Sequence, residues 1–288
     1  MQKPNVTPFF DEDTFTFSYV VKDPDSAACA IIDPVLDFAS NSGRTARRSA
    51  DRVVEHVRAH GLRVEWILET HVHADHLTAA PYLKEALGGN TAIGAHVTTV
   101  QKVFGDLFNV EESFSRSGDQ FDRLWNEGDT FAIGGLQGRV LHTPGHTPAC
   151  LTYVIGDCGF VGDTLFMPDY GTARCDFPGG DAATLYRSIR RIFALPDETR
   201  LFMCHDYKAP GRDAYAWETT VGIQKRENIH AHEGVSEAEF VKMRTERDAT
   251  LDMPRLMLPS VQVNMRAGDF PPAEANGVRY LKLPVDAV

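Results

Sequence analysis

The chain has 288 residues, of which 43% are apolar and 24% charged, a composition typical of a globular protein that buries a sizeable core. Its formal charge of −11 disfavours nucleic acid or an anionic membrane surface as the main partner. No apolar run approaches the roughly 20 residues that a membrane span needs, and the N-terminus lacks the apolar core of a secretory signal. We therefore expect a cytoplasmic protein whose five cysteines, none in a CxxC pair, are free thiols.

The first half of the chain alternates apolar runs with turn residues and helical patterns. Strands are expected over Phe15–Val21 and Ala27–Val35, followed by a helix over Thr45–His60, where valines recur at helical spacing. A strand over Val64–Leu68 and a helix over Leu77–Leu87, which ends at two glycines, come next.

The second half is predicted to contain more strands. Two hairpins are expected around Gly134-Gly135 and Gly156-Asp157, because each of these turns separates two short apolar runs. A helix over Asp181–Leu195 begins with Asp181 as its N-terminal cap, and a strand over Arg200–Cys204 follows.

Strands at both ends with helices between them predict a layered α/β sandwich rather than a simple Rossmann alternation. We expect a single domain over residues 1–288, in which residues 215–288 form a helical and irregular C-terminal extension. The proline-rich segment Met253–Val288 within it can wrap its own domain or a partner, and a homodimer is the general expectation if the chain associates.

Three imidazoles and a carboxylate follow the predicted strand Val64–Leu68, contributed by His71, His73, Asp75 and His76. Imidazole and carboxylate groups are usual ligands for zinc and iron. A turn after the strand would direct all four side chains into one space. A single cluster of this kind also fits a chance surface grouping, so its interpretation depends on the rest of the chain.

Three further residues of ligand type each follow an apolar strand: His146, Asp163 and His205. Gly145 and Gly162 precede two of them and permit tight backbone turns that a side chain would obstruct. Ligands gathered at strand ends can surround a metal and still leave coordination positions open, as catalysis requires. The ordered set predicts a metal centre, whereas the isolated histidines elsewhere are interpreted as ordinary surface or core residues.

The ordered series HxHxDH…H…D…H resembles the metallo-β-lactamase superfamily, over most of the first 210 residues. The resemblance implies an αββα sandwich, in which two mixed β-sheets are flanked by helices and the metal site lies at one edge of the sheets. All seven ligand-type residues are present, which permits a dinuclear site. In the similar glyoxalase II enzymes one metal would be held by His71, His73 and His146 and the other by Asp75, His76 and His205, with Asp163 bridging.

Three segments are more similar to persulfide dioxygenases of the ethylmalonic-encephalopathy-protein type, namely Gly171–Phe177 with the pattern Gly-x-x-Arg-x-Asp-Phe, His205-Asp206-Tyr207, and Asn264-Met265-Arg266. The similarity runs nearly end to end, and the long glutathione-binding helical domain of glyoxalase II is not apparent. This resemblance implies Fe(II)-dependent oxidation of glutathione persulfide, or a related small-molecule persulfide, by O₂ to sulfite and thiol in sulfide detoxification.

On this resemblance one Fe(II) per chain would be held by His71, His146 and Asp163, the two-histidine, one-carboxylate set of non-haem iron oxygenases. The other residues of the series would orient these ligands or bind a second metal; they are His73, Asp75, His76 and His205. The choice of iron over two zinc ions rests on the family resemblance alone.

Arg174 and Tyr207 are the candidates for substrate binding, because a guanidinium suits the carboxylates of glutathione and Tyr207 follows His205 closely. An ion pair between Arg174 and Asp176 is an equal alternative. Cys204 should face away from His205, since neighbouring residues of a strand point to opposite sides.

Two other functions fit the sequence. One is a dinuclear zinc thioester hydrolase of the glyoxalase II type. The other is a non-catalytic protein that retains the site and responds to sulfide or metal.

Overall fold

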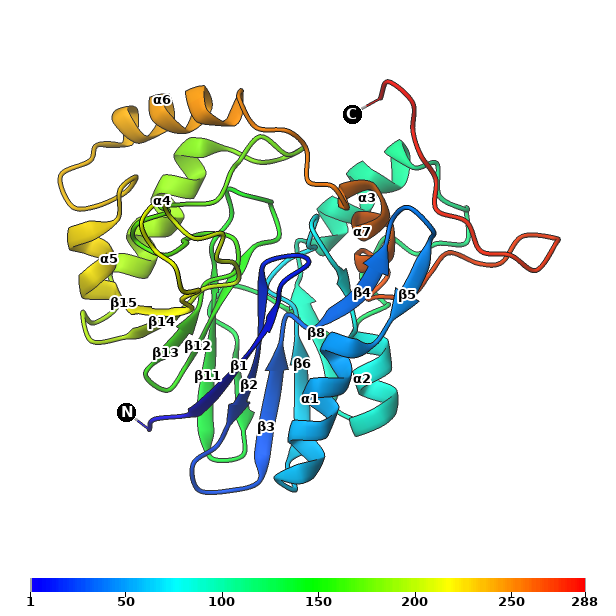
Figure 1. Cartoon of the computed structure of the whole chain (residues 1–288), viewed down its shortest axis with the longest axis horizontal. Helices are drawn as coiled ribbons and strands as arrows, with labels where there is room; N and C mark the ends of the chain where they lie inside the picture. The colour runs from blue at the N-terminus through cyan, green and yellow to red at the C-terminus, as the bar shows by residue number, and fades with distance from the viewer. Residues whose placement is uncertain (1, 288) are drawn as a thin grey trace.

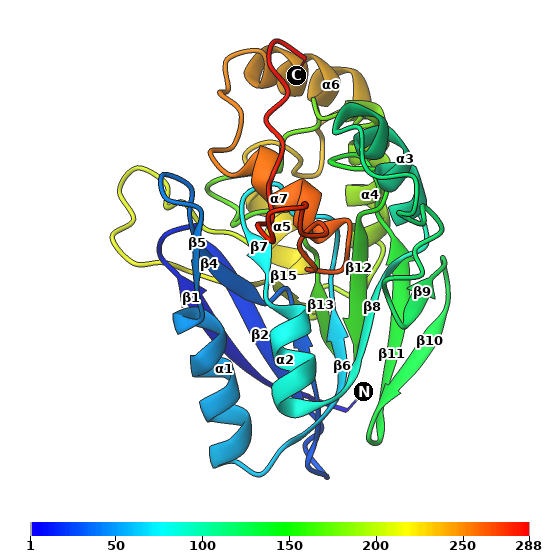
Figure 2. The same ribbon diagram turned by 90° about the vertical axis from the view of Figure 1, so that its right-hand side faces the viewer.

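The computed structural model describes residues 2–287, in which two six-stranded β-sheets pack face to face between helices (Figures 1 and 2). The first sheet comprises, in spatial order, β1 (Asn5–Asp11), β2 (Thr16–Lys22), β3 (Ala28–Ile32), β6 (Arg63–Leu68), β8 (Asn90–Gly94) and β9 (Arg123–Trp125). The pairs β1–β2 and β2–β3 are antiparallel, whereas β3, β6, β8 and β9 run parallel. The carboxyl ends of β3 and β6 therefore meet at the same edge of the sheet.

The second sheet comprises, in spatial order, β10 (Thr130–Ile133), β11 (Leu136–His142), β12 (Leu151–Ile155), β13 (Cys158–Phe160), β14 (Arg200–Phe202) and β15 (Glu218–Thr220). Its pairs are antiparallel except β13–β14, so β11, β13 and β14 all point in one direction. A small third sheet contains β5 (Arg44–Ala46), β4 (Val35–Ala39) and β7 (Leu77–Thr78).

Seven helices are described: α1 (Arg48–Ala59), α2 (Ala80–Leu87), α3 (Val97–Leu107), α4 (Ala182–Phe193), α5 (Val221–Glu227), α6 (Glu237–Asp248) and α7 (Met257–Asn264). The apolar faces of α1 and α2 pack on the outer face of the first sheet, and those of α4 and α6 pack beside the second sheet (Figure 1). Figure 2 shows α3 and α7 above the strand ends, where their side chains form a cluster of their own. The predicted αββα sandwich is confirmed.

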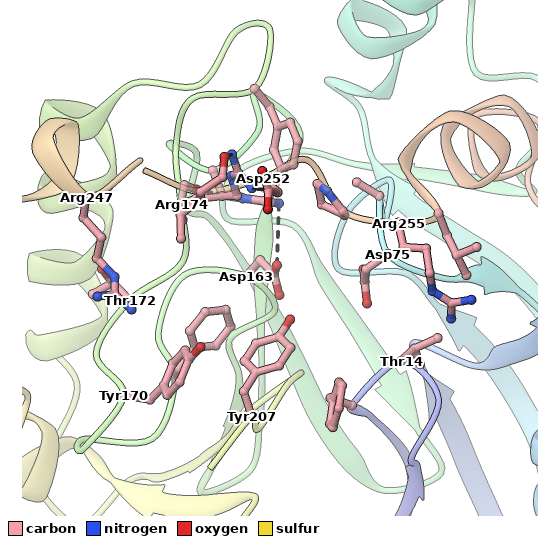
Figure 3. A pocket seen from close by; sticks show the side chains of 18 of the residues that line it. Thr14, Asp75, Asp163, Tyr170, Thr172, Arg174, Tyr207, Arg247, Asp252 and Arg255 are labelled. Atoms are coloured by element: carbon pink, nitrogen blue, oxygen red, sulfur yellow. Dashed lines mark hydrogen bonds and ion pairs between the residues drawn. The ribbon is translucent and has the colours of Figure 1, made fainter. Parts of the chain in front are cut away.

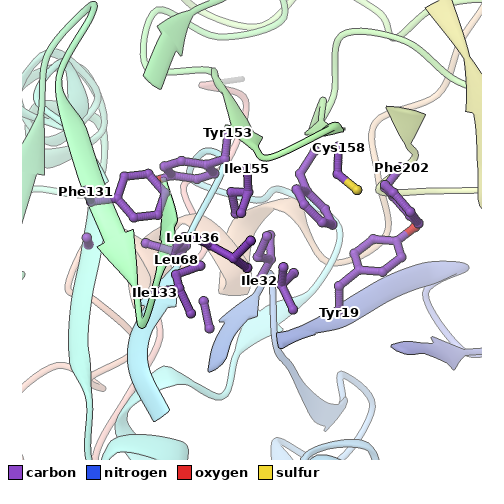
Figure 4. Packing of buried hydrophobic residues seen from close by; sticks show 14 of the residues in the cluster. Tyr19, Ile32, Leu68, Phe131, Ile133, Leu136, Tyr153, Ile155, Cys158 and Phe202 are labelled. Atoms are coloured by element: carbon purple, nitrogen blue, oxygen red, sulfur yellow. The ribbon is translucent and has the colours of Figure 1, made fainter. Parts of the chain in front are cut away.

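The main core lies between the two sheets, where Tyr19, Ile32 and Leu68 face Tyr153 and Phe202 (Figure 4). Fully burying one apolar side chain of this size contributes roughly 1.5–3 kcal/mol. The buried tyrosine hydroxyls also find partners: Tyr19 donates to the carbonyl of Met203 at 2.5 Å, and Tyr153 donates to that of Glu69 at 2.9 Å. These two bonds tie the core to loops at the carboxyl ends of the strands.

Three predicted boundaries are wrong, and long-range strand pairing explains two of them. The strand expected over Ala27–Val35 breaks at Asp33, whose φ of 49° ends β3 before β4 begins. The helix expected from Thr45 begins at Arg48, because residues 44–46 pair with β4. The helix expected from Leu77 begins at Ala80, because residues 77–78 pair with the other side of β4.

Within residues 2–287, no helix has both the length and the apolar character that a bilayer crossing demands.

Candidate metal centre

The predicted ligands lie at one edge of the sandwich, where several strands of both sheets have their carboxyl ends. The histidine cluster follows β6, His146 follows β11, Asp163 follows β13 and His205 follows β14. Because these strands end at one edge of the sandwich, their loops converge there. Loops can hold ligands precisely at this edge, since the packed sheets below fix where each loop starts.

Two histidines and one carboxylate form one compact group of candidate ligands. One ligand atom from each of His71, His146 and Asp163 lies within 4.8 Å of the other two, and all three residues are buried. His146 Nε2 is 3.6 Å from Asp163 Oδ2, and the rings of His71 and His146 stand perpendicular with centroids 5.2 Å apart. A cation between these atoms would satisfy groups that protein hydrogen bonds leave open.

The hydrogen bonds behind the two imidazoles fix which nitrogen faces this space. His146 Nδ1–H donates to the carbonyl of Arg174 at 2.8 Å. The Thr70 hydroxyl donates to Asp33 Oδ2 at 2.9 Å, so it accepts from His71 Nδ1–H at 3.0 Å. Each imidazole therefore presents an Nε2 lone pair, as a metal ligand must.

Unpaired buried atoms support the same assignment. His71 Nε2 and Asp163 Oδ1 have no hydrogen-bond partner within the described residues. Burial, followed by the neighbouring imidazoles of His73 and His146, lowers the pKa of His71 well below its usual value and keeps the ring neutral. Buried polar atoms without partners are rare, and an ion that completes the site is a standard explanation.

A second set of candidate ligands lies beside the first. His205 Nε2 is 3.3 Å from Asp163 Oδ1 and 3.4 Å from Asp75 Oδ2, while His205 Nδ1 faces the carbonyl of Phe15 at 3.3 Å. Burial alone would raise the pKa of Asp75, but His205 and His76 lower it well below the usual value. Three electron-rich atoms that converge in this way need a proton or a cation between them.

His73 lies against two buried carboxylates instead of facing the first group. Its Nε2 is 3.0 Å from Asp33 Oδ1 and 3.3 Å from Glu69 Oε2, whereas its Nδ1 has no partner among the described residues. Burial opposes protonation of this ring, but the Asp33 and Glu69 carboxylates raise the pKa of His73 well above its usual value. Asp33 therefore positions two imidazoles, His73 directly and His71 through Thr70.

The loop that carries His146 depends on a glycine. Gly145 has a φ of 140°, and a Cβ atom there would lie 2.3 Å from the Leu185 Cα atom of α4. Helix α4 in turn is capped by Asp181, which accepts from Thr184 N at 2.7 Å as the sequence predicted. The glycine lets the His146 loop run directly against the first turn of the helix.

This geometry can be compared with known proteins. The family model described as the metallo-beta-lactamase superfamily matches residues 11–205, which include every predicted ligand. The chain belongs to the metallo-β-lactamase superfamily.

Individual superfamily relatives carry different names. The chain is 61% identical to the "Probable metallo-hydrolase" of Burkholderia pseudomallei over 97% of this chain and 98% of the relative. It is 47% identical to "Glyoxylase B2" of Dictyostelium discoideum, over 99% of this chain and 98% of that protein. It is 31% identical to the human mitochondrial persulfide dioxygenase ETHE1, over 90% of this chain and 87% of that protein. Among solved structures, ETHE1 from Myxococcus xanthus matches with a TM-score of 0.73 and 30% identity, covering 92% of this chain and all (100%) of that one.

In this superfamily member, the segment Asn264-Met265-Arg266 holds the metal-site loop. The amide Nδ2 of Asn264 donates to the carbonyls of His73 and His76, at 2.8 and 2.7 Å, and its Oδ1 accepts from Thr78 N at 2.8 Å. Arg266 forms a two-pronged ion pair with Glu111, at 2.6 and 2.8 Å. The family resemblance singled out this segment, and its contacts give it a physical role.

A cavity of about 330 Å³ leads from the metal centre to the surface (Figure 3). Asp75, His146 and Asp163 form part of its floor, and aromatic rings that include Phe166, Tyr170, Phe177 and Tyr207 line its wall. Burial, followed by Asp75 and Asp163, raises the pKa of Tyr207 well above its usual value, so its hydroxyl keeps its proton. The cavity has room for a small thiol compound beside the metal.

Both residues predicted to bind substrate line this cavity, and their roles stay predictions. The Arg174 guanidinium donates to both oxygens of Asp176, at 2.6 and 2.7 Å, and to the carbonyl of Asp252 at 2.6 Å. Its main-chain carbonyl is the acceptor for His146. Arg174 thus connects His146 with the segment before α7. Most N–H groups of its guanidinium are already bonded to Asp176 and Asp252.

The prediction for Cys204 is wrong. Its Sγ lies 3.6 Å from Asp33 Oδ2, and it shares a buried group with His73 and His205 instead of facing away from His205. Strand β14 ends at Phe202, so the alternation of a strand no longer applies at positions 204 and 205. Burial raises the pKa of Cys204 well above its usual value, and the thiol stays neutral.

Sequence reasoning missed the residues behind the ligands. Asp33, Glu69 and Thr70 are all buried and position the histidines, yet none belongs to the ligand series. The sequence does contain one signal for Asp33. It is followed by Pro34 and comes directly after an apolar strand, so the strand is expected to end at this polar residue. Cys175, which belongs to the segment Gly171–Phe177, is a buried neutral thiol, and burial raises its pKa to about 12.

Proposed function

We propose that this protein is an Fe(II)-dependent persulfide dioxygenase. The observation that carries the proposal is the buried group of His71, His146 and Asp163, of which the last two line a cavity, because two histidines and one carboxylate are the ligand set of non-haem iron oxygenases. The similarity to the human protein named persulfide dioxygenase ETHE1 and to the structure of ETHE1 from Myxococcus xanthus supports the choice of reaction. The balanced reaction is RSSH + O₂ + H₂O → RSH + SO₃²⁻ + 2 H⁺.

The metal would be held by His71 Nε2, His146 Nε2 and the Asp163 carboxylate, and it would supply open coordination positions for the two substrates. The protein's own residues do the rest. Thr70 and the Arg174 carbonyl fix the two imidazoles in the ligand tautomer. Phe166, Tyr170 and the other rings of the wall exclude water and offer aromatic edges to the substrate sulfur.

The test is oxygen consumption by protein that has been loaded anaerobically with Fe(II). We expect uptake of O₂ with glutathione persulfide and about one sulfite formed per O₂ consumed, which the reaction requires. The variants His146→Ala and Asp163→Ala should lose this activity together with the bound iron. No oxygen uptake in protein that does contain iron would overturn the proposal.

A second candidate function is a dinuclear zinc thioester hydrolase. It is favoured by the convergence of His205 Nε2 on Asp75 and Asp163, which leaves room for a second cation. The 47% identity to the protein named "Glyoxylase B2" points the same way. Elemental analysis separates the two candidates, because about two zinc ions per chain favour the hydrolase and about one iron favours the dioxygenase. Hydrolysis of S-D-lactoylglutathione is the matching activity assay.

Within this proposal the partners are a small-molecule persulfide and O₂. A cytoplasmic location and a homodimer stay predictions.

A further inference from the structure

Four arginines line the cavity, and two of them are neutralised by neighbouring carboxylates. Arg174 is paired with Asp176 through both of that residue's oxygens. Arg244 is fully buried and paired with Asp248, at 2.9 Å from Nε and 2.6 Å from Nη2. Neither guanidinium is free to neutralise a charged ligand without breaking a short ion pair.

Arg247 and Arg255 differ from them. Both line the cavity and are exposed, and neither side chain makes a hydrogen bond or ion pair with any residue between 2 and 287. Arg247 is near the end of α6, and Arg255 belongs to the segment that precedes α7. Figure 3 shows them on opposite sides of the cavity, with Asp163 of the metal centre between them.

Charge is uneven around this opening. The protein as a whole carries −11, yet two unpaired guanidinium groups flank the entrance to the metal centre. Asp13, which also lines the cavity, is paired with Arg48 at 3.2 Å. Asp252 contributes a carboxylate that makes no ion pair among the described residues. The rim therefore suits a ligand with negative charge at two separate ends and one positive group.

We propose that Arg247 and Arg255 bind the two terminal carboxylates of a peptide thiol whose sulfur lies at the metal centre. This inference rests on the proposed function and adds two binding residues for its substrate, glutathione persulfide, a γ-glutamyl peptide with a central cysteine. Such a ligand carries a carboxylate at each end, and its glutamyl ammonium matches Asp252. A guanidinium fork binds a carboxylate through two hydrogen bonds.

The experiment compares Arg247→Gln, Arg255→Gln and the double variant with the wild type. Arg226→Gln is the matched control, because Arg226 is also exposed and unpaired among the described residues but lies on α5 outside the cavity. Each single variant should raise KM for glutathione persulfide roughly tenfold, the effect of losing one charge-assisted contact, and leave kcat within about twofold. The control should change neither.

A chemical cycle assigns each arginine to one end of the ligand. Esterifying the glycine carboxylate of the substrate should raise KM of the wild type about tenfold. In the variant that lacks the arginine for that end, the ester and the unmodified substrate should have the same KM. In the other variant the ester should raise KM about tenfold, as it does in the wild type. An equal effect of the ester in the wild type and both variants would overturn the inference.

Failure of the inference and of the proposed function are distinguishable. Calorimetry with reduced glutathione measures binding without turnover, and both variants should weaken its Kd while Arg226→Gln should not. If the iron protein oxidises persulfide but neither variant alters KM or Kd, the inference is wrong and the proposed function stands. If the wild type consumes no oxygen yet the variants weaken glutathione binding, the substrate class stands and the dioxygenase activity does not.

Discussion

Replacing Asn264 by alanine should loosen the loop that carries the histidine cluster. Asn264 lies at the end of α7, is 4% exposed, and uses all of its close polar contacts on residues 73–78. Two of its bonds go to the carbonyls of His73 and His76, and the third comes from Thr78 N. Alanine keeps the helix but leaves all three backbone groups without partners.

The expected loss follows from these three bonds. A buried hydrogen bond contributes about 1 kcal/mol net, and each backbone group left unpaired adds to the cost, so the free energy of unfolding should fall by about 3–5 kcal/mol. For a chain of 288 residues that corresponds to roughly 5–8 °C in Tm. Because His71 and His76 lie on the released loop, metal affinity should also fall, by about 10- to 100-fold as when other ligand-supporting contacts are removed.

The same helix provides a matched control. Gln262 is 3% exposed and makes three bonds of the same kind, donating to the carbonyls of Leu258 and Lys282 and accepting from Lys282 N. Its partners are α7 itself and the C-terminal segment, not the metal-site loop. Gln262→Ala should therefore lower stability by a similar amount and leave metal affinity unchanged.

The assays are urea denaturation, to obtain the free energy of unfolding, and competition with a chelator, to obtain metal affinity. Equal loss of metal from both variants would show that metal binding simply follows global stability. Full metal affinity in Asn264→Ala, at any stability, would refute the claim that this residue holds the loop in place.

Three other changes test separate features. Thr70→Val removes the hydroxyl that orients His71 and should weaken metal binding about 10-fold or more, whereas Thr70→Ser should not. Gly145→Ala forces a side chain into α4 and should cost about 3 kcal/mol or more in unfolding free energy, together with the metal. Burial, followed by Arg244, lowers the pKa of His230 to about 4, below its unfolded value of about 6.5. The folded protein thus binds fewer protons, so stability should fall by on the order of 2 kcal/mol as pH drops from 6.5 to 4, and His230→Gln should flatten this dependence.

Controls exist for two of these changes. Gly43 also has a positive φ, of 65°, but a Cβ there meets nothing within 4 Å, so Gly43→Ala should cost only about 1 kcal/mol. A comparable loss at both glycines would contradict the clash with α4. His60 is exposed, and His60→Gln should leave the pH dependence of stability intact. A pH profile that His230→Gln does not alter would place the responsible group elsewhere.

The sequence predicted the layers of this fold better than its edges. Helix α4 was expected with its cap, since local spacing and Asp181 are sufficient signals for a helix. Strand β1 and all but the first residue of β4 were not expected, and β5 and β7 lay largely in segments assigned to helices. These strands exist because of partners far along the chain, and local periodicity carries no information about such partners.

The candidate site shows the same contrast between features encoded locally and features that depend on distant partners. The ligand-type residues could be found because each follows an apolar strand, and parallel strands deliver their ends to one edge. The contacts that orient them could not be predicted, because Asp33 reaches His73 across 40 positions of sequence and Asn264, which only the family resemblance singled out, reaches it across 191. A buried carboxylate or amide of this kind looks like any other polar residue until the fold places it beside an imidazole.

His73 shows why the set of metal ligands cannot be predicted from the motif alone. An imidazole whose Nε2–H points at a carboxylate offers Nδ1 either as a ligand, when that nitrogen is bare, or as a donor, when it carries a proton. Burial opposes the second proton, whereas Asp33 and Glu69 raise the pKa of His73 and favour it. Each pKa unit adds about 1.4 kcal/mol to what a cation must supply to displace that proton from His73. The carboxylates at positions 33 and 69, both outside the HxHxDH series, therefore influence whether His73 joins the metal ligands.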